Sequence, residues 1–192
     1  FQEILGFRNL EELTSRIDMF SYRVLKKDCL DLPDKLYTVR HVKLTDEQYK
    51  MYNKIKHDAL MLLDDGDLVT TPAVITQLLR LQQIMSGHLK TDDGKIMTFK
   101  SARMDALMDI LEEHDGKAII WSRFRHDIRE ITSKLQEIHG EGCAASYFGD
   151  TKDNVRFSLV QTFQNPESKL KYFVGNPATA GYGLTLTEAN LV

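Results

Sequence analysis

A basic cluster follows a short apolar run near the middle of the chain. The run is "KAIIW" (Lys117–Trp121), and from Lys117 to Arg129 four basic residues accompany one acid, a local net charge of 4 − 1 = +3. Arginine binds phosphate oxygens through paired hydrogen bonds, so Arg123 and Arg125 are candidate phosphate ligands. A solvated loop in which Arg129 pairs with a neighbouring carboxylate explains the same pattern equally well.

The closing segment, "VGNPATAGYGLTLTEANLV" (Val174–Val192), combines glycines with hydroxyl side chains after another apolar run. Gly181 and Gly183 would let the backbone approach an anion, as in phosphate-binding loops at the carboxyl edge of parallel sheets. The threonines that could donate hydrogen bonds or cap a short helix are Thr179, Thr185 and Thr187. A strand-to-helix turn that merely requires glycine is the alternative.

A third segment, "YFGDTKDNVR" (Tyr147–Arg156), is typical of a strand end, a turn at Gly149 and a helix capped by Asp150 or Thr151. Arg156 falls in the first turns of that helix, where a cation opposes the helix dipole. A bound anion would explain its place, and a simple surface arginine is the alternative.

Several kinds of site lack support in the sequence. Cys29 and Cys143 form no spaced cluster and the histidines show no HxxxH or HExxH pattern, so we predict no metal site. The chain has no GxxxxGKS or GxxxxGKT phosphate loop and no DExH-like motif, so we predict no catalytic residue in it.

Charge and hydropathy limit the partners. The formal net charge of −3 gives no overall attraction to nucleic acid or to an anionic membrane, so any such binding depends on a local patch. No apolar run approaches the roughly eighteen residues of a membrane span. We expect an intracellular protein without a membrane partner, cytoplasmic in a bacterium or virus and nuclear in a eukaryote.

The C-terminal half alternates apolar runs with helical periodicity, which positions these three segments. The predicted strands are 117–121, 143–147 and 170–175, and the predicted helices are 103–113, 126–138 and 153–163. This alternation is typical of βαβ units in a parallel sheet covered on both faces. The fold class is therefore α/β.

The N-terminal half is mainly helical. We predict a helix over 10–20, a charged connector over 23–35 and a strand over Leu36–Leu44. Thr45 and Gln48 form a capping-box pattern at the start of a long helix, broken at 64–67. A further helix begins at Thr71-Pro72 and ends at Gly87. The turn-rich stretch 90–95 reads as a hinge, and the predicted domains are 1–34, 35–95 and 96–192.

Five blocks in this order resemble the second motor lobe of superfamily 2 helicase-like ATPases, specifically the SWI/SNF-type DNA translocases. The blocks are "YRVLKKDCLDLPDKLYTVRHVKLTDEQYKMYNKI", "ITQLLRLQQIMSGHL", "SARMDALMDIL" with "GKAIIWSRF", "YFGDTKDNVRFSLVQTFQ" and "KYFVGNPATAGYGLTLTEANLV".

The resemblance implies a RecA-like fold for the α/β half, with ATP and Mg bound in the intact protein between two such lobes that track double-stranded DNA. It implies DNA contacts by Ser122, Arg123, Arg125, Asn176 and Thr179. It assigns Gly181 and Gly183 to the nucleotide, and Gly149 and Arg156 to a further conserved block.

Departures from the family pattern shape the remaining expectations. Thr185 stands where many members carry Asn, and neither the first lobe nor the arginine-finger motif is present, so we expect a fragment cut after motif V. The parent would be an ATP hydrolase with the missing first lobe as partner, and the fragment alone would be inactive, with no tightly bound cofactor. The alternative is a stand-alone α/β nucleotide-binding or protein-interaction module, which would not need the basic cluster at 123–129.

Overall fold

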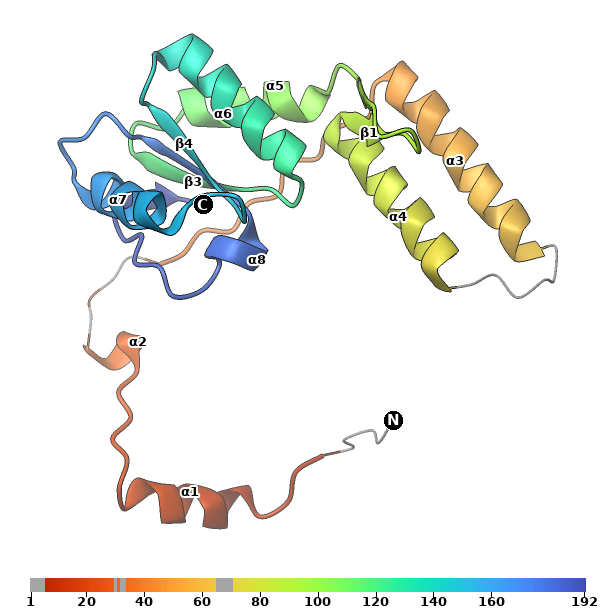
Figure 1. The fold of residues 1–192 in the computed structure, drawn as a ribbon. Coiled ribbons are helices and arrows are strands. Elements are labelled where there is room, and N and C mark those ends of the chain that lie inside the picture. The colour runs from red at the N-terminus through yellow and green to blue at the C-terminus, as the bar shows by residue number, and fades with distance from the viewer. Residues whose placement is uncertain (1–5, 30, 32–33, 65–70) are drawn as a thin grey trace. The chain divides into compact units, whose positions relative to one another are not determined.

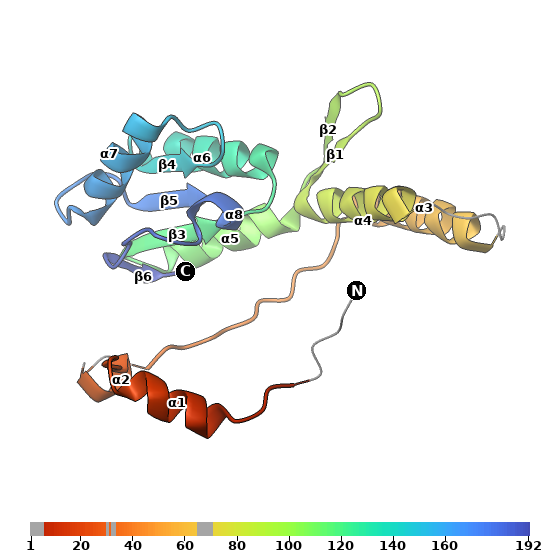
Figure 2. The ribbon, with the colours of Figure 1, turned by 60° about the horizontal axis from the view of Figure 1, so that its bottom comes forward.

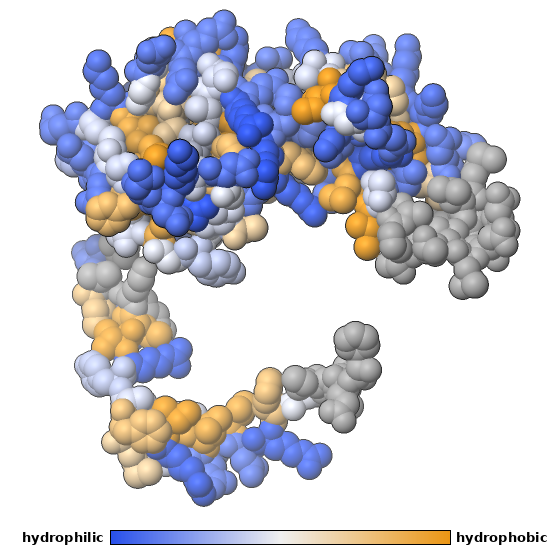
Figure 3. All heavy atoms as spheres, viewed as in Figure 1, coloured by the Kyte–Doolittle hydropathy of each residue, from blue (hydrophilic) through white to orange (hydrophobic). Residues whose placement is uncertain are grey.

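The computed structural model describes residues 6–29, 31, 34–64 and 71–192, and the chain divides into two compact units, residues 1–40 and 41–192. The first unit contains helices α1 (Leu10–Asp18) and α2 (Lys26–Cys29) (Figure 1). The helix predicted from residue 10 is confirmed. Its apolar residues, including Leu10, Leu13 and Ile17, remain exposed and form an orange stripe along α1 in the space-filling view (Figure 3).

The strand predicted over Leu36–Leu44 is wrong, because these residues form neither helix nor strand. Leu36 and Tyr37 are 90% and 87% exposed. Side chains with high β-propensity favour a strand only where a neighbouring strand supplies the hydrogen bonds and the packing. No strand in the described residues pairs with this segment.

The described part of residues 41–192 contains a four-stranded parallel sheet in the order β4-β5-β3-β6 (Figure 2). Its strands are β3 (Lys117–Trp121), β4 (Ala144–Tyr147), β5 (Tyr172–Gly175) and β6 (Ala189–Leu191). The helices around it are α5 (Ala102–Glu112), α6 (Arg125–His139), α7 (Asp153–Gln164) and α8 (Pro177–Ala180). The α/β prediction and its three strands are confirmed, and β6 was not predicted.

Both faces of the sheet are covered, which explains why the strands read as continuous apolar runs. Helices α5 and α6 cover one face and α7 the other (Figure 1). Strand residues in the first core are Ala118, Ile120, Ala144, Tyr172 and Val174. Buried residues of the second core are Ile119, Tyr147, Phe163, Leu170, Phe173 and Ala180.

A helical arm precedes the sheet and consists of α3 (Asp46–Asp64), α4 (Thr71–Ser86), β1 (His88–Lys90) and β2 (Ile96–Thr98). The predicted capping box is present: Thr45 N donates to Gln48 Oε1 at 3.2 Å, and Gln48 N donates to Thr45 Oγ1 at 3.3 Å. Gln48 Nε2 also donates to the carbonyl of Ile84 at 2.7 Å, which joins α3 to α4.

The stretch 90–95, predicted as a hinge, is the connection of an antiparallel hairpin between β1 and β2 (Figure 2). Strands of three residues are too short to show a periodic pattern. Gly87 ends α4 as predicted: its φ is +100°, a conformation that favours glycine. The predicted break begins at the last residue of α3, Asp64, and its remainder lies outside the described residues. The domain boundaries at 34 and 95 stay predictions.

Among the helices of the described residues, none has the length and apolarity needed to cross a membrane.

Candidate nucleic-acid interface

The loops that follow β3, β4 and β5 lie together at the carboxyl edge of the sheet. Ser122 N donates to the carbonyl of Gly175 at 2.9 Å, and Asn176 N donates to the carbonyl of Tyr147 at 3.0 Å. Parallel strands end at the same edge, so the three segments singled out in the sequence converge here. The structure thus brings residues 122–125, 149–150 and 176 side by side.

Arg123 is the exposed cation of the loop after β3. Its guanidinium donates to Gln82 Oε1 at 2.7 Å, and its backbone carbonyl accepts from Asn176 Nδ2 at 2.7 Å. Within the described residues no carboxylate lies at ion-pair distance from Arg123, so its positive charge is not cancelled locally. A cation held by a neutral partner suits the recognition of a phosphate group.

Ser122 points in another direction. Its hydroxyl donates to Asp127 Oδ2 at 3.1 Å, and Asp127 is buried at 8% exposure on α6. The hydroxyl is therefore already engaged, although its oxygen can still accept a hydrogen bond.

Arg125 and Arg129 share one carboxylate, that of Asp150 in the loop after β4. The guanidinium of Arg125 donates to Asp150 Oδ2 at 3.0 Å, and that of Arg129 lies 3.7 Å from the same oxygen. All three side chains are more than half exposed, so these ion pairs contribute only modestly to stability. The sequence-based alternative of a carboxylate partner for Arg129 is therefore correct, and it extends to Arg125.

Lys117 does not belong to the basic surface, although it counted toward the charge of +3. It is 9% exposed at the start of β3, away from the carboxyl edge. Its ammonium donates to the carbonyls of Phe163 and Asn165 at 2.7 and 2.5 Å and to Ser168 Oγ at 3.0 Å. Burial lowers the pKa of Lys117 from its ordinary value.

Arg156 folds back on the turn between β4 and α7. It donates to the carbonyl of Gly149 at 3.1 Å and lies 3.3 Å from a carboxylate oxygen of Asp153 in the same helical turn. Asp153 supplies the anion that a cation at this end of a helix requires.

The predicted caps of this helix, Asp150 and Thr151, are wrong, because the N-cap is Lys152 and it makes no side-chain cap. Asp150 is engaged by arginine, and Thr151 Oγ1 accepts from Phe148 N at 3.1 Å. Both side chains that could have capped α7 are therefore used by the preceding turn.

The closing segment begins with a side-chain cap. Asn176 Oδ1 accepts from Ala178 N at 2.8 Å, while its Nδ2 holds the carbonyl of Arg123. One amide therefore ties the loop after β3 to the loop after β5. The half-buried Thr179 follows it on α8, with its backbone N–H donating to the carbonyl of Asn176 at 3.0 Å.

The two glycines of this segment have different environments. A Cβ on Gly181 would lie 2.4 Å from the backbone oxygen of Pro177, so the close turn of α8 requires glycine there. Gly183 is exposed, has φ +76°, and a Cβ there would have no atom within 4 Å. Of the two, Gly183 fits an exposed backbone that an anion could approach.

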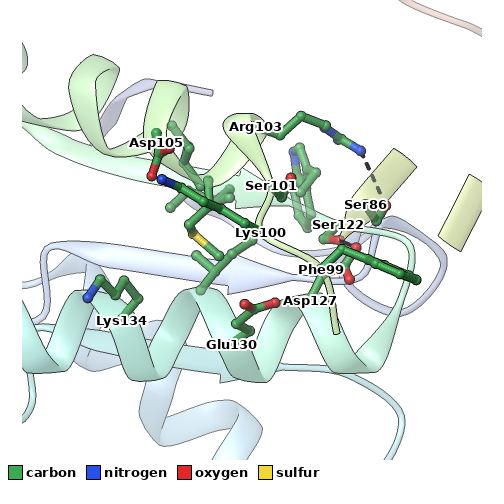
Figure 4. A pocket seen from close by; sticks show the side chains of 15 residues that line it. Ser86, Phe99, Lys100, Ser101, Arg103, Asp105, Ser122, Asp127, Glu130 and Lys134 are labelled. Carbon is green, nitrogen blue, oxygen red and sulfur yellow. Dashed lines mark hydrogen bonds between the residues drawn. The ribbon is translucent and has the colours of Figure 1, made fainter. Parts of the chain in front are cut away.

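A hollow of about 370 Å³ lies between α5, α6 and the end of β3, with Ser122 and Asp127 side by side within it (Figure 4). Its ionisable lining comprises three cations and three acids, namely Lys100, Arg103, Lys134, Asp105, Asp127 and Glu130. The charges balance, so the hollow adds nothing to the basic edge. No cluster of three or more potential metal ligands occurs in the described part of the chain.

The sequence assigned no role at this edge to Gln82, His88 or Asp127, and it predicted Asp150 only as a helix cap. His88 Nδ1 lies 2.8 Å from Asp127 Oδ1, and neither atom has a hydrogen bond with good geometry in the described residues. Their roles depend on contacts between segments 25 to 41 residues apart, for which a single sequence carries no signal.

Comparison with known proteins shows similarity along the whole chain. Residues 102–192 match the helicase conserved C-terminal domain. An uncharacterized ATP-dependent helicase of Mycoplasma genitalium is 26% identical over 100% of this chain and 18% of its own length. YwqA of Bacillus subtilis, provisionally named an ATP-dependent helicase/translocase, is 24% identical over 96% of this chain and 21% of its own length. The chain thus spans about a fifth of these relatives.

Solved structures agree with this result. The SWI2/SNF2 ATPase core domain of Sulfolobus solfataricus superposes with a TM-score of 0.64 at 28% identity, covering 94% of this chain and 39% of that one. The separate C-terminal domain of a Sulfolobus solfataricus SWI2/SNF2 ATPase gives a TM-score of 0.63 at 24% identity, covering 77% of this chain and 66% of that one.

Proposed function

Because the chain carries the C-terminal RecA-like lobe of a SWI/SNF-type superfamily 2 helicase-like ATPase, we propose that it grips double-stranded DNA and forms half of an ATP cleft. The whole protein would be an ATP-dependent DNA translocase in which this lobe works against a first motor lobe. Binding would be to the phosphate backbone and independent of base sequence.

The observation that carries the proposal is Arg123, an exposed arginine whose charge is uncancelled among the described residues, at the converging loops of the carboxyl edge. Arg125 and Arg129 follow Arg123 in the sequence and lie on the first turns of α6, but both form ion pairs with Asp150. We therefore assign the strongest phosphate contact to Arg123, with weaker support from Arg125.

Asn176 is proposed to couple the DNA and nucleotide sides. Its amide joins Arg123 to the start of α8, and the chain then continues to the exposed backbone at Gly183. When bound with Mg²⁺ in the whole protein, ATP would supply the free energy for opening and closing the lobes. A displacement of the loop at Gly183 would then move Arg123 through the hydrogen bonds of the Asn176 side chain.

The test measures fluorescence anisotropy of the 192-residue chain with a labelled 30-base-pair duplex at 50 and 200 mM NaCl. About three phosphate contacts would weaken binding roughly 40-fold over this range. Two unrelated duplex sequences should bind equally. Arg123→Ala should lower the salt dependence by about one contact, and Lys95→Ala, which removes an exposed charge from the β1–β2 connection, serves as control.

The alternative, a stand-alone nucleotide-binding module, predicts a different result. Such a chain would bind ATP in titration calorimetry, lose that binding in Gly183→Val and remain indifferent to duplex DNA. In the whole protein, our proposal expects Arg123→Ala to lower DNA-stimulated ATPase far more than basal ATPase. An equal loss of both would indicate a folding role for Arg123.

A further inference from the structure

We propose that Gln82 and His88 of the helical arm are positioning residues that set the geometry of the phosphate-contacting loop Ser122–Arg125. This inference rests on the proposed function. It assigns to the arm a part in DNA binding that requires no contact between the arm and DNA.

Gln82 fixes Arg123 without neutralising it. The amide oxygen accepts one N–H of the guanidinium at 2.7 Å, and the group retains further N–H donors for a phosphate. A carboxylate at position 82 would hold the arginine in the same place but would cancel its charge. The neutral amide of Gln82 therefore fixes the position of the Arg123 side chain and leaves its positive charge available for a phosphate.

His88 holds the other end of the loop through Asp127. The carboxylate of Asp127 uses its two oxygens separately: Oδ1 lies 2.8 Å from His88 Nδ1, and Oδ2 accepts from Ser122 Oγ at 3.1 Å. His88 and Asp127 are only 3% and 8% exposed, so water competes little for these contacts. The imidazole also packs edge-on against Phe124, with ring centroids 5.2 Å apart.

The loop is thus held from two sides. Gln82 and His88 come from the arm, whereas Asn176 holds the backbone carbonyl of Arg123 from the side of β5. These contacts bond the side chain and the carbonyl of Arg123, and its guanidinium also lies 6.0 Å from the centroid of the Phe124 ring. A displacement of α4 against the sheet would therefore change the affinity for DNA.

The first test compares Gln82→Glu, Gln82→Ala and the control Gln161→Glu, which adds the same charge to an exposed position of α7. Duplex binding is measured as above at several salt concentrations, and circular dichroism melts verify the fold. Gln82→Glu should weaken binding about tenfold and lower the salt slope by about 0.9, equivalent to one lost phosphate contact. Gln82→Ala should weaken binding about threefold at an unchanged slope, since only the ordering of Arg123 is lost.

The second test separates the positioning role of His88 from stability. His88→Asn keeps a polar side chain beside the carboxylate of Asp127, whereas His88→Leu replaces it with an apolar one. At a temperature where both variants are folded, His88→Asn should bind within about threefold of wild type and His88→Leu about tenfold more weakly. Equal DNA affinities for the two variants would refute a positioning role for His88.

The outcomes distinguish this inference from the function on which it rests. If the wild-type chain does not bind duplex DNA, the proposed function fails and the inference falls with it. If the wild type binds and Gln82→Glu behaves like Gln161→Glu, the function stands and the role of Gln82 is refuted.

Discussion

Under the proposed function, Asp150 would compete with DNA for Arg125 and Arg129, so Asp150→Asn should tighten DNA binding. The carboxylate engages Arg125 at 3.0 Å and Arg129 at 3.7 Å. A phosphate on the far side of a guanidinium would lie about 6 Å from Asp150, where repulsion in water costs about 0.7 kcal/mol. Releasing an exposed ion pair adds about 0.5 kcal/mol. The combined effect, about 1.2 kcal/mol, corresponds to roughly eightfold tighter binding at low salt.

The assay is duplex anisotropy at 50 and 300 mM NaCl. The gain should shrink at the higher salt, because screening weakens interactions between exposed charges. Asp109→Asn is the matched control, since it removes the same charge from an exposed position of α5. The free energy of unfolding should fall by less than about 1 kcal/mol in Asp150→Asn. If Asp150→Asn bound no more tightly than Asp109→Asn, Arg125 and Arg129 would not contact phosphate and the reasoning would be refuted.

Four further predictions concern stability and reactivity. Gly181→Ala should lower the free energy of unfolding in urea by about 2 kcal/mol, because its Cβ would collide with the backbone oxygen of Pro177; an unchanged midpoint would contradict this. Lys117→Met should cost about 2 kcal/mol in the same assay, since the buried carbonyl of Phe163 loses its ammonium donor. Burial raises the pKa of the Cys143 thiol, so the unfolded thiol ionises first and stability falls as pH rises above the ordinary thiol pKa. Iodoacetamide should label the exposed Cys29 long before Cys143, as mass spectrometry can check.

The sequence predicted those parts of the fold that local patterns determine. The runs at 117–121 and 170–175 are mainly apolar because both faces of the sheet are covered, and Thr45 with Gln48 forms a capping box that the local sequence specifies. The strand predicted over Leu36–Leu44 was wrong because strand formation also depends on a partner strand, which local sequence does not specify. Its composition suits a strand, but a strand exists only with a partner, and composition does not reveal partners.

The candidate site likewise contains residues that local patterns could place and partners that they could not. The positions of Arg123 and Asn176 after two strands were sufficient to place them at one edge. Their partners were not predictable, because Gln82 lies 41 residues before Arg123 and Asp150 lies 25 residues after Arg125. Lys117 was counted in the basic cluster because it is close in sequence, although its ammonium is buried at the other end of β3.

The side chain of Gln48 has a consequence for how the helical arm moves. One amide accepts from Thr45 at the first turn of α3 and donates to Ile84 near the end of α4. Fraying of the first turn of α3 would therefore break the hydrogen bond between Gln48 and Ile84 that holds α4, so α3 and α4 should open together. Amide hydrogen exchange would report one common opening free energy for residues near 48 and near 84. The arm would then transmit motion to the loop at Arg123 as a lever and would not absorb it.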